Sequence, residues 1–211
     1  MTAVLGLKLG PQHDTGACLV WEDKGVLRCC ALSEERLSRR KQDRQFPKLA
    51  IDAVLAEAGL PLSAVDLVCV DKLGPNTMVE QTRPIGTVDP DTWQPEEKAF
   101  FLALEGKPAF VVNHHLAHAA TAYYPFNRDK AAVDGSGSDW PLEDSGDRLI
   151  MQGRPDEVGN YPLRRYPRRA ETQSIFKARG TTLERIATST RSGAGHFYSY
   201  ISKHVVGFGQ L

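Results

Sequence analysis

The sequence has no surplus of charge of either sign and no long hydrophobic run. Its 211 residues contain 26 Lys and Arg against 26 Asp and Glu, so the formal net charge is zero. Nucleic-acid binders usually carry a basic surplus, and we therefore expect no nucleic-acid partner. The apolar runs fall short of the roughly 20 residues that a membrane span needs. Residues 1–10 also lack the basic start and apolar core of a secretory signal. These absences predict a cytoplasmic protein that does not associate with membranes.

Cysteine is sparse, and its spacing is not that of a zinc site or a redox motif. Cys18, Cys29, Cys30 and Cys69 form no Cys-x-x-Cys pair. Three of them lie in apolar, strand-like runs, where cysteine acts as a small hydrophobic residue. A reducing compartment fits this usage. The remaining composition, 41% hydrophobic and 25% charged residues, is that of an ordinary globular protein.

What the sequence does contain is a succession of strand and helix patterns. Short β-prone runs are separated by turn signals such as Asp23-Lys24-Gly25, and other runs place apolar residues at helical spacing. The predicted elements are strands at 3–8, 17–21 and 26–32, a helix at 48–58, a strand at 65–70, a helix at 96–105, a strand at 109–112, a helix from 114, a strand stub at 130–133 and a helix at 196–206. Residues 74–95 are expected to form a long loop.

This order predicts an α/β fold with a mixed sheet and helices on both faces. Three hairpin-linked strands followed by alternating helices and strands are similar to a ribonuclease-H-like unit, which the actin, sugar-kinase and Hsp70 group uses in pairs. We expect residues 1–128 to form a first lobe and residues 129–211 to begin a second, incomplete lobe. Residues 141–170, which are polar, basic and proline-bearing, are expected to be an insertion.

The sharpest local motif is a pair of histidines within Asn113-His114-His115-Leu116-Ala117-His118. On a helix, His114 and His118 face the same way because they are four residues apart. Two neutral imidazoles at this spacing can hold one metal ion. A third ligand, expected to be a carboxylate, must come from elsewhere. The alternative is a helix start with ordinary surface or core histidines, and the motif lacks the glutamate of a metalloprotease helix.

Three weaker motifs are candidates for anion or phosphate binding. His13 and Asp14 lie in a Gly-flanked turn, which exposes backbone N–H groups. The charged run 34–41, which includes Arg36, suits a phosphate-bearing substrate. A loop of Asp134, Gly135, Ser136 and Gly137 after a strand stub would allow close approach to a phosphate. The alternatives are a plain hairpin turn, a solvated charged segment and a common Gly-Ser loop.

Taken together, these motifs resemble a known family. The run GPQHDTGACLVWEDKG and its continuation to residue 60, and the run VNHHLAHAATAYYPF at 112–126, resemble the N-terminus of O-carbamoyltransferases of the nodulation and antibiotic-tailoring type. DGSGSDWPLED at 134–144 is similar to the antibiotic-tailoring branch. The resemblance extends, in order, over nearly the whole chain.

The resemblance implies a transferase with a two-lobed ribonuclease-H-like domain followed by a YrdC-like domain. Such enzymes make carbamoyl-adenylate from carbamoyl phosphate and ATP and then move the carbamoyl group to a hydroxyl of a sugar or other natural product. It implies that His114 and His118 hold a divalent, iron-type metal. It also implies that His13, Asp14 and Lys41 lie near the transferred group, with His13 as the candidate base. Arg36, Asp134, Gly135 and Gly137 are the candidate substrate- or phosphate-binding residues.

The chain departs from the family in its extent. The family's third metal ligand, an Asp, and the rest of the second lobe would lie beyond residue 211, so a truncated form is expected. A separate chain that supplies the missing parts is then an expected partner, alongside a small hydroxyl acceptor. Two alternatives stay open: a non-catalytic metal- or nucleotide-binding remnant of the same fold, and a relative of the tRNA threonylcarbamoyl transferases.

Overall fold

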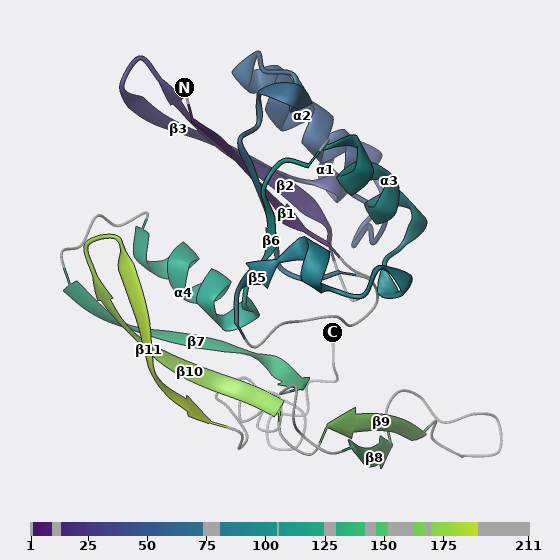
Figure 1. Cartoon of the computed structure of the whole chain (residues 1–211), viewed down its shortest axis with the longest axis vertical. Helices are drawn as coiled ribbons and strands as arrows, with labels where there is room; N and C mark the ends of the chain where they lie inside the picture. The colour runs from purple at the N-terminus through teal and green to yellow at the C-terminus, as the bar shows by residue number, and fades with distance from the viewer. Residues whose placement is uncertain are drawn as a thin grey trace. The chain divides into compact units, whose positions relative to one another are not determined.

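The computed structural model of the chain forms two compact units, residues 1–113 and 114–211 (Figure 1). No helix among the described residues is both long enough and apolar enough to cross a membrane. The residues that the structure describes are 2–9, 14–73, 81–104, 106–124, 130–141, 147–151, 163–167 and 170–189.

A six-stranded mixed sheet organises the first unit. Its strands are β1 (Ala3–Lys8), β2 (Gly16–Asp23), β3 (Val26–Ser33), β4 (Leu67–Val70), β5 (Arg83–Pro84) and β6 (Ala109–Val111). The strand order is β3-β2-β1-β4-β6-β5. The hairpin-linked strands β1, β2 and β3 are antiparallel, whereas β4 runs parallel to both β1 and β6. This arrangement confirms the predicted α/β fold with a mixed sheet.

Helices cover one face of this sheet and form the core with it. The helices are α1 (Glu34–Ser38), α2 (Lys48–Ala58) and α3 (Pro95–Ala103), accompanied by three short 3-10 turns at 62–64, 85–87 and 90–92. Alternate strand residues such as Leu5, Leu19 and Val68 are fully buried, as the period of two in a strand requires. They pack in one cluster with Val54 and Leu55 of α2.

Two local signals place the ends of these elements as predicted. Lys24 and Gly25 have φ values of 52° and 79° and connect β2 to β3. A two-residue hairpin of this kind needs positive φ at both positions. Gly59 ends α2 with φ of 64°, and its N–H donates to the carbonyl oxygen of Ala56. A left-handed residue at this position costs glycine little because it has no Cβ.

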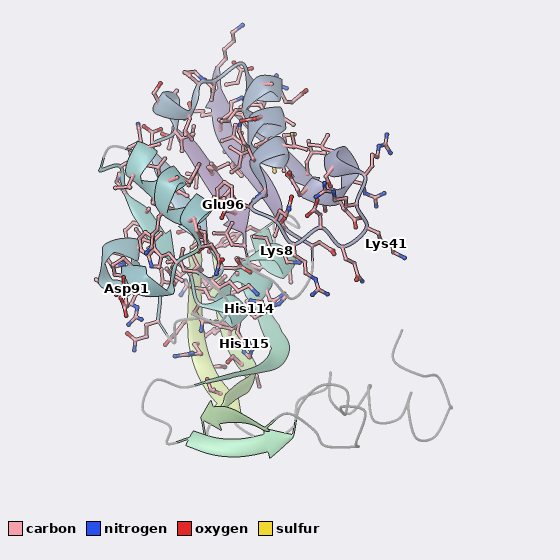
Figure 2. The ribbon with its side chains drawn as sticks, turned by 90° about the vertical axis from the view of Figure 1, so that its right-hand side faces the viewer. Lys8, Lys41, Asp91, Glu96, His114 and His115 are labelled. Carbon is pink, nitrogen blue, oxygen red and sulfur yellow. The ribbon has the colours of Figure 1, made fainter. Side chains whose placement is uncertain are left out.

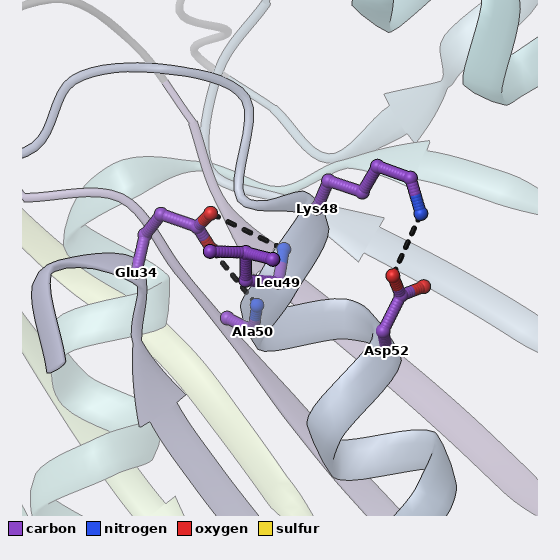
Figure 3. A network of polar contacts seen from close by, with 5 residues as sticks. All are labelled: Glu34, Lys48, Leu49, Ala50 and Asp52. Carbon is purple, nitrogen blue, oxygen red and sulfur yellow. Dashed lines mark hydrogen bonds and ion pairs between the residues drawn. The ribbon is translucent and has the colours of Figure 1, made fainter. Parts of the chain in front are cut away.

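The start of α2 depends on a buried carboxylate from another element (Figure 3). Glu34 is only 4% exposed, and its two oxygens accept the N–H groups of Leu49 and Ala50 at 3.2 and 2.8 Å. These are N–H groups that the first turn of a helix leaves without partners. The negative charge also favours the positive end of the helix dipole. Glu34, a member of the charged run that suits a phosphate, therefore stabilises the helix start.

The second unit joins a helix to a separate antiparallel sheet. Its elements are α4 (His114–Tyr123), β7 (Lys130–Pro141), β10 (Ala170–Arg179) and β11 (Thr182–Ser189), with strand order β11-β10-β7. Ala119 and Tyr123 of α4 pack against Phe176 and Ala178 of β10. The unit boundary therefore precedes α4, whereas the sequence-based division at residue 128 assigns this helix to the first lobe.

The strand β7 continues through the segment that the sequence predicts as a Gly-rich loop, and that prediction is wrong. Asp134 is paired with Ile175 and Gly135 with Ser174, and the ladder reaches Pro141. Pairing with β10 supplies backbone partners that the local sequence does not reveal. The predicted insertion, 141–170, contains the hairpin of β8 (Asp147–Met151) and β9 (Leu163–Pro167). The predicted helix at 196–206 lies outside the described residues.

Replacing Glu34 with Gln should lower the free energy of unfolding by about 1–2 kcal/mol, because one charged acceptor is lost at the α2 start. Asp52→Asn is the matched control. Asp52 accepts from Lys48 at 2.6 Å on the exposed side of the same helix, and such surface pairs contribute under about 0.5 kcal/mol. Urea unfolding of both variants checks this. Equal losses in the two variants would contradict the assigned role of Glu34.

Candidate functional site

The candidate site of the first unit lies where the parallel strands β1, β4 and β6 end. In sheets of this kind, ligands bind outside the carboxyl ends of the strands. Residues 9–15 follow β1, residues 71–73 follow β4, and residues 112–113 follow β6. The Val112 N–H donates to the carbonyl oxygen of Val70 at 2.8 Å, so the ends of β4 and β6 are held in register.

Asp71, directly after β4, joins the ends of two strands. Its carboxylate accepts the N–H of Leu9 at 2.9 Å, and its own N–H donates to the carbonyl oxygen of Leu7 at 3.3 Å. Burial raises the pKa of this carboxyl to about 6, although the Leu9 hydrogen bond and the charge of Lys72 act in the opposite direction. A buried carboxyl with a shifted pKa at this edge marks a candidate proton-transfer or positioning group.

Lys72 is the cation beside this carboxyl. It is buried, and desolvation lowers the pKa of its ammonium group while the charge of Asp71 acts to raise it. The two residues thus bring a partly buried carboxyl and a buried amine to the end of β4. Neither residue is among the candidates that the sequence motifs predict. The available signal was that a charged pair directly follows a β-branched run.

Thr15 connects the segment after β1 to the charged loop that carries Lys41. Its N–H donates to the carbonyl oxygen of Asp43 at 3.0 Å, and its Oγ1 donates to that of Gln45 at 2.7 Å. Its carbonyl oxygen in turn accepts the Glu34 N–H at 2.9 Å. Thr15 is buried, so these bonds are shielded from water. They keep residues 14–16 beside residues 43–45.

Lys41 stands at the surface of this loop (Figure 2). Arg39 and Gln42 on either side have φ values of 60° and 56°, a conformation that side chains other than glycine adopt with a cost of order 1 kcal/mol each. The Glu35 carboxylate accepts the Gln42 N–H at 2.9 Å and holds the turn. Among the described residues, none forms an ion pair with Lys41.

The carboxyl of Asp43 reinforces the same loop. The Ser38 hydroxyl and the Gln45 N–H donate to it, and these hydrogen bonds hold the pKa of Asp43 below its usual range. A carboxylate that stays ionised keeps accepting both bonds. The loop conformation around Lys41 is therefore held from α1, from Thr15 and from Asp43.

In the second unit, His114 and His118 face the same way on α4, as their spacing predicts. Their Nε2 atoms are 3.0 Å apart, and the ring centroids are 4.5 Å apart with an interplanar angle of 85°. Two imidazole nitrogens bound to one ion lie about 2.1 Å from it, and twice that length exceeds 3.0 Å. The distance is compatible with a shared metal ion, and it is also that of a hydrogen bond between the two rings. No group of three or more His, Cys, Asp or Glu side chains among the described residues is placed to hold one.

His115 lies next to this pair on α4, with its ring centroid 6.1 Å from that of His114, and it anchors the helix to its sheet. It is 1% exposed, and its Nδ1 is 3.2 Å from Oγ of the buried Ser174 on β10. Ser174 Oγ is in turn 3.3 Å from Oγ1 of Thr188 on β11. This chain of contacts fixes the rotation of α4 and so determines which side of the helix carries His114 and His118.

The predicted site residues divide between the two units. Asp14 is half-buried in the first unit, next to the Thr15 contacts, whereas Arg36 is exposed and its Nε is 3.7 Å from the Glu35 carboxylate. His13 lies outside the described residues. The second unit carries the remaining predicted residues, which are His114, His118, Asp134, Gly135 and Gly137.

Asp71→Asn should stabilise the protein at about pH 7.5 and change little below about pH 4. The pKa of Asp71 is raised from 3.8 to about 6, so the folded state binds this proton more tightly. The contribution of Asp71 to stability is complete below the unfolded pKa and is lost as the pH rises through about 6. Asn keeps an oxygen for the Leu9 N–H without the buried charge, a gain on the order of 1–3 kcal/mol.

The matched control is Asp66→Asn, since Asp66 accepts the Ala3 N–H at 2.8 Å at the opposite end of the same strands and is exposed. Urea unfolding at the two pH values measures both variants. Equal destabilisation of Asp71→Asn at both pH values would contradict a buried carboxyl with a raised pKa.

Comparison with known proteins gives one family and several relatives. Residues 3–86 match the family model described as carbamoyltransferase N-terminus. An uncharacterized protein of Synechocystis sp., sll1178, is 31% identical over 164 residues, which cover 65% of this chain and 26% of that protein. The chain thus spans about a quarter of the length of this relative.

Solved structures resemble the chain at low identity. YeaZ from Pseudomonas aeruginosa is 14% identical with a TM-score of 0.45, covering 96% of this chain and 80% of that one. A protein described as similar to peptidase YEAZ from Pseudomonas aeruginosa is 14% identical with a TM-score of 0.43, covering 91% of this chain and 67% of that one. The strands β1 to β4, the Glu34 contacts and the Lys41 loop all lie within residues 3–86, the part of the chain that is similar to the carbamoyltransferase N-terminus.

Proposed function

We propose that this chain is the N-terminal part of an O-carbamoyltransferase that acts on a hydroxyl of a sugar or other natural product. The observation that carries the proposal is the match of residues 3–86 to the carbamoyltransferase N-terminus. The donor in this proposal is carbamoyl-adenylate, made from carbamoyl phosphate and ATP. The remaining catalytic parts would come from a separate chain or from further sequence.

The first unit supplies the donor-binding groups in this proposal. The Lys41 ammonium is exposed on a loop whose backbone is held by Thr15, Asp43 and Glu35, so the backbone position of Lys41 is fixed while its charge stays accessible. A cation presented in this way can offset the negative charge that develops on oxygen during acyl transfer. The left-handed residues Arg39 and Gln42 beside it fit a loop kept under strain for function.

The second unit supplies the metal ligands. His114 and His118 would hold a divalent, iron-type ion, because their Nε2 atoms converge to 3.0 Å. Such an ion, when bound, supplies Lewis acidity that polarises the carbamoyl carbonyl. The imidazoles must be neutral to bind it, so binding weakens as the pH falls below the usual histidine range. Anchoring of α4 through His115 and Ser174 keeps both rings on one side of the helix.

In the proposed transfer step, one bond to the carbamoyl carbon forms and one breaks. The acceptor hydroxyl oxygen forms a bond to the carbamoyl carbon, and the bond from that carbon to the AMP phosphate oxygen breaks. The hydroxyl proton passes to a base, for which His13 is the candidate, and AMP leaves with the electron pair. Asp14, which is half-buried beside the Thr15 contacts, is the candidate to orient the donor group.

A non-catalytic metal- or nucleotide-binding remnant of the same fold is the second candidate, since the convergence of the His114 and His118 Nε2 atoms to 3.0 Å would serve metal binding alone. Such a remnant would bind a metal ion through the histidine pair but would not bind a carbamoyl donor. Metal binding and donor binding, measured separately on the 211-residue chain, therefore distinguish the two functions.

His114→Ala and His118→Ala should each lower the affinity for Co²⁺ at least about tenfold, since each removes one of two ligands. Thr121→Ala is the control, because it changes an exposed side chain on the same helix that is not an imidazole. Titration followed by the visible absorption of Co²⁺ measures the affinity. Unchanged binding by the double variant would remove the metal role of the pair.

Lys41→Ala should weaken binding of a non-hydrolysable sulfamate analogue of carbamoyl-adenylate about tenfold, the loss of one charge-assisted contact. Lys48→Ala, which removes an exposed lysine already paired with Asp52, should leave binding unchanged. Isothermal titration calorimetry of the full chain measures both. A chain that binds Co²⁺ but not the analogue would be the remnant.

A further inference from the structure

Two of the four cysteines come into contact in the β2–β3 hairpin. Cys18 Sγ on β2 and Cys29 Sγ on β3 are 3.5 Å apart. All four cysteines are free thiols in this structure. The sequence spacing does not reveal this pair, because the two residues lie on different strands and are brought together by the hairpin register.

The register explains why these two thiols meet and a third does not. Cys18 is paired with Ala31 and Val20 with Cys29, so Cys18 and Cys29 are diagonal neighbours on the same face of the sheet. Cys30 is paired with Leu19, which is fully buried, and Cys30 packs against the core on the opposite face. Adjacent cysteines in the sequence are thus separated by the sheet.

The two contacting thiols differ in exposure. Cys29 is exposed, whereas Cys18 is half-buried. Burial, followed by the contact with Cys29, raises the pKa of Cys18 to about 12. Cys29 is therefore the thiol that meets a reagent from solution, and Cys18 is the neighbour that can act only after losing its proton.

We propose that Cys18 and Cys29 form a site of reversible oxidation by low-molecular-weight disulfides of the glutathione class. The Cys29 thiolate attacks one sulfur of the disulfide, and one small thiolate leaves. Cys18 then gives its proton to solvent and attacks Cys29 Sγ in the mixed disulfide, and the second small thiolate leaves. Two protein thiols are oxidised and one small disulfide is reduced to two thiols. This site does not depend on the proposed function.

The resulting bond is expected to be easily reduced. A disulfide needs its two Cβ atoms about 3.5–4.5 Å apart, whereas diagonal neighbours in an antiparallel pair are separated by more than directly opposite ones. Closing the bond must therefore draw β2 and β3 together and increase their local twist. Strained and exposed disulfides have the more oxidising potentials typical of reversible bonds, and a transient bond is compatible with a reducing compartment.

The experiment uses the reduced full chain with oxidised glutathione, followed by alkylation, trypsin digestion and mass spectrometry. Trypsin places Cys18 in the fragment 9–24 and Cys29 with Cys30 in the fragment 29–36. We expect these fragments to be linked, and the link to disappear with excess reduced glutathione. Cys30→Ser should keep the link, Cys29→Ser should lose it, and Cys18→Ser should accumulate glutathione on Cys29.

A link that persists in Cys29→Ser, or its loss in Cys30→Ser, would overturn the assignment. A second measurement needs no variant. In the folded chain, tandem mass spectrometry should place the link between Cys18 and Cys29, because Cys30 lies on the other face of the sheet; in concentrated urea, where the register is lost, Cys30 should be linked as well. Equal linking of Cys29 and Cys30 in the folded chain, or no link there, would also overturn the proposal.

Discussion

The parallel pairing of β4 with β1 and β6 is the constraint on which the candidate site of the first unit depends. It brings the ends of three strands, far apart in the sequence, to one edge of the sheet. Asp71 stabilises this edge because its carboxylate accepts the Leu9 N–H and its own N–H donates to the carbonyl oxygen of Leu7. Leu9, from which the segment with Asp14 starts, is therefore held in place. If the strands were antiparallel here, these residues would be at opposite ends of the sheet.

Buried polar groups have two different consequences in this unit. Glu34 lies at a helix start, where N–H groups and the helix dipole favour its charge, and it holds α2 in place. Asp71 accepts a single backbone N–H in a buried position, and burial raises its pKa to about 6. The Glu34 arrangement stabilises the fold, whereas the ionised Asp71 carboxylate lowers the stability of the folded state. Such a perturbed carboxyl is typical of functional sites. Thr15 connects the two regions, because its carbonyl oxygen accepts the Glu34 N–H and its side chain holds the Lys41 loop.

Local signals predicted much of the fold, and long-range pairing accounts for most of what they missed. The hairpin turn at Lys24-Gly25 and the end of α2 at Gly59 follow from backbone conformations that few residues adopt. The facing of His114 and His118 follows from the helical repeat. By contrast, Asp134 and Gly135 lie in a strand because β10 pairs with them. Asp71 gains its role from Leu9 through a contact between distant residues that no short motif encodes, whereas the contact of Cys18 with Cys29 follows from the register that the Lys24-Gly25 turn sets.

The most direct test of donor binding at this edge is the set of backbone amide NMR shifts that the sulfamate analogue of carbamoyl-adenylate causes in the full chain. We expect shifts at residues 14–16, 41–45 and 71–72, which the parallel strands and the Thr15 bonds place together at one edge of the first unit. Amides at the far end of the hairpin, residues 24–25, should not move. Shifts confined to the hairpin turn and to residues 59–61, with none at the carboxyl ends of β1 and β4, would contradict donor binding at this edge.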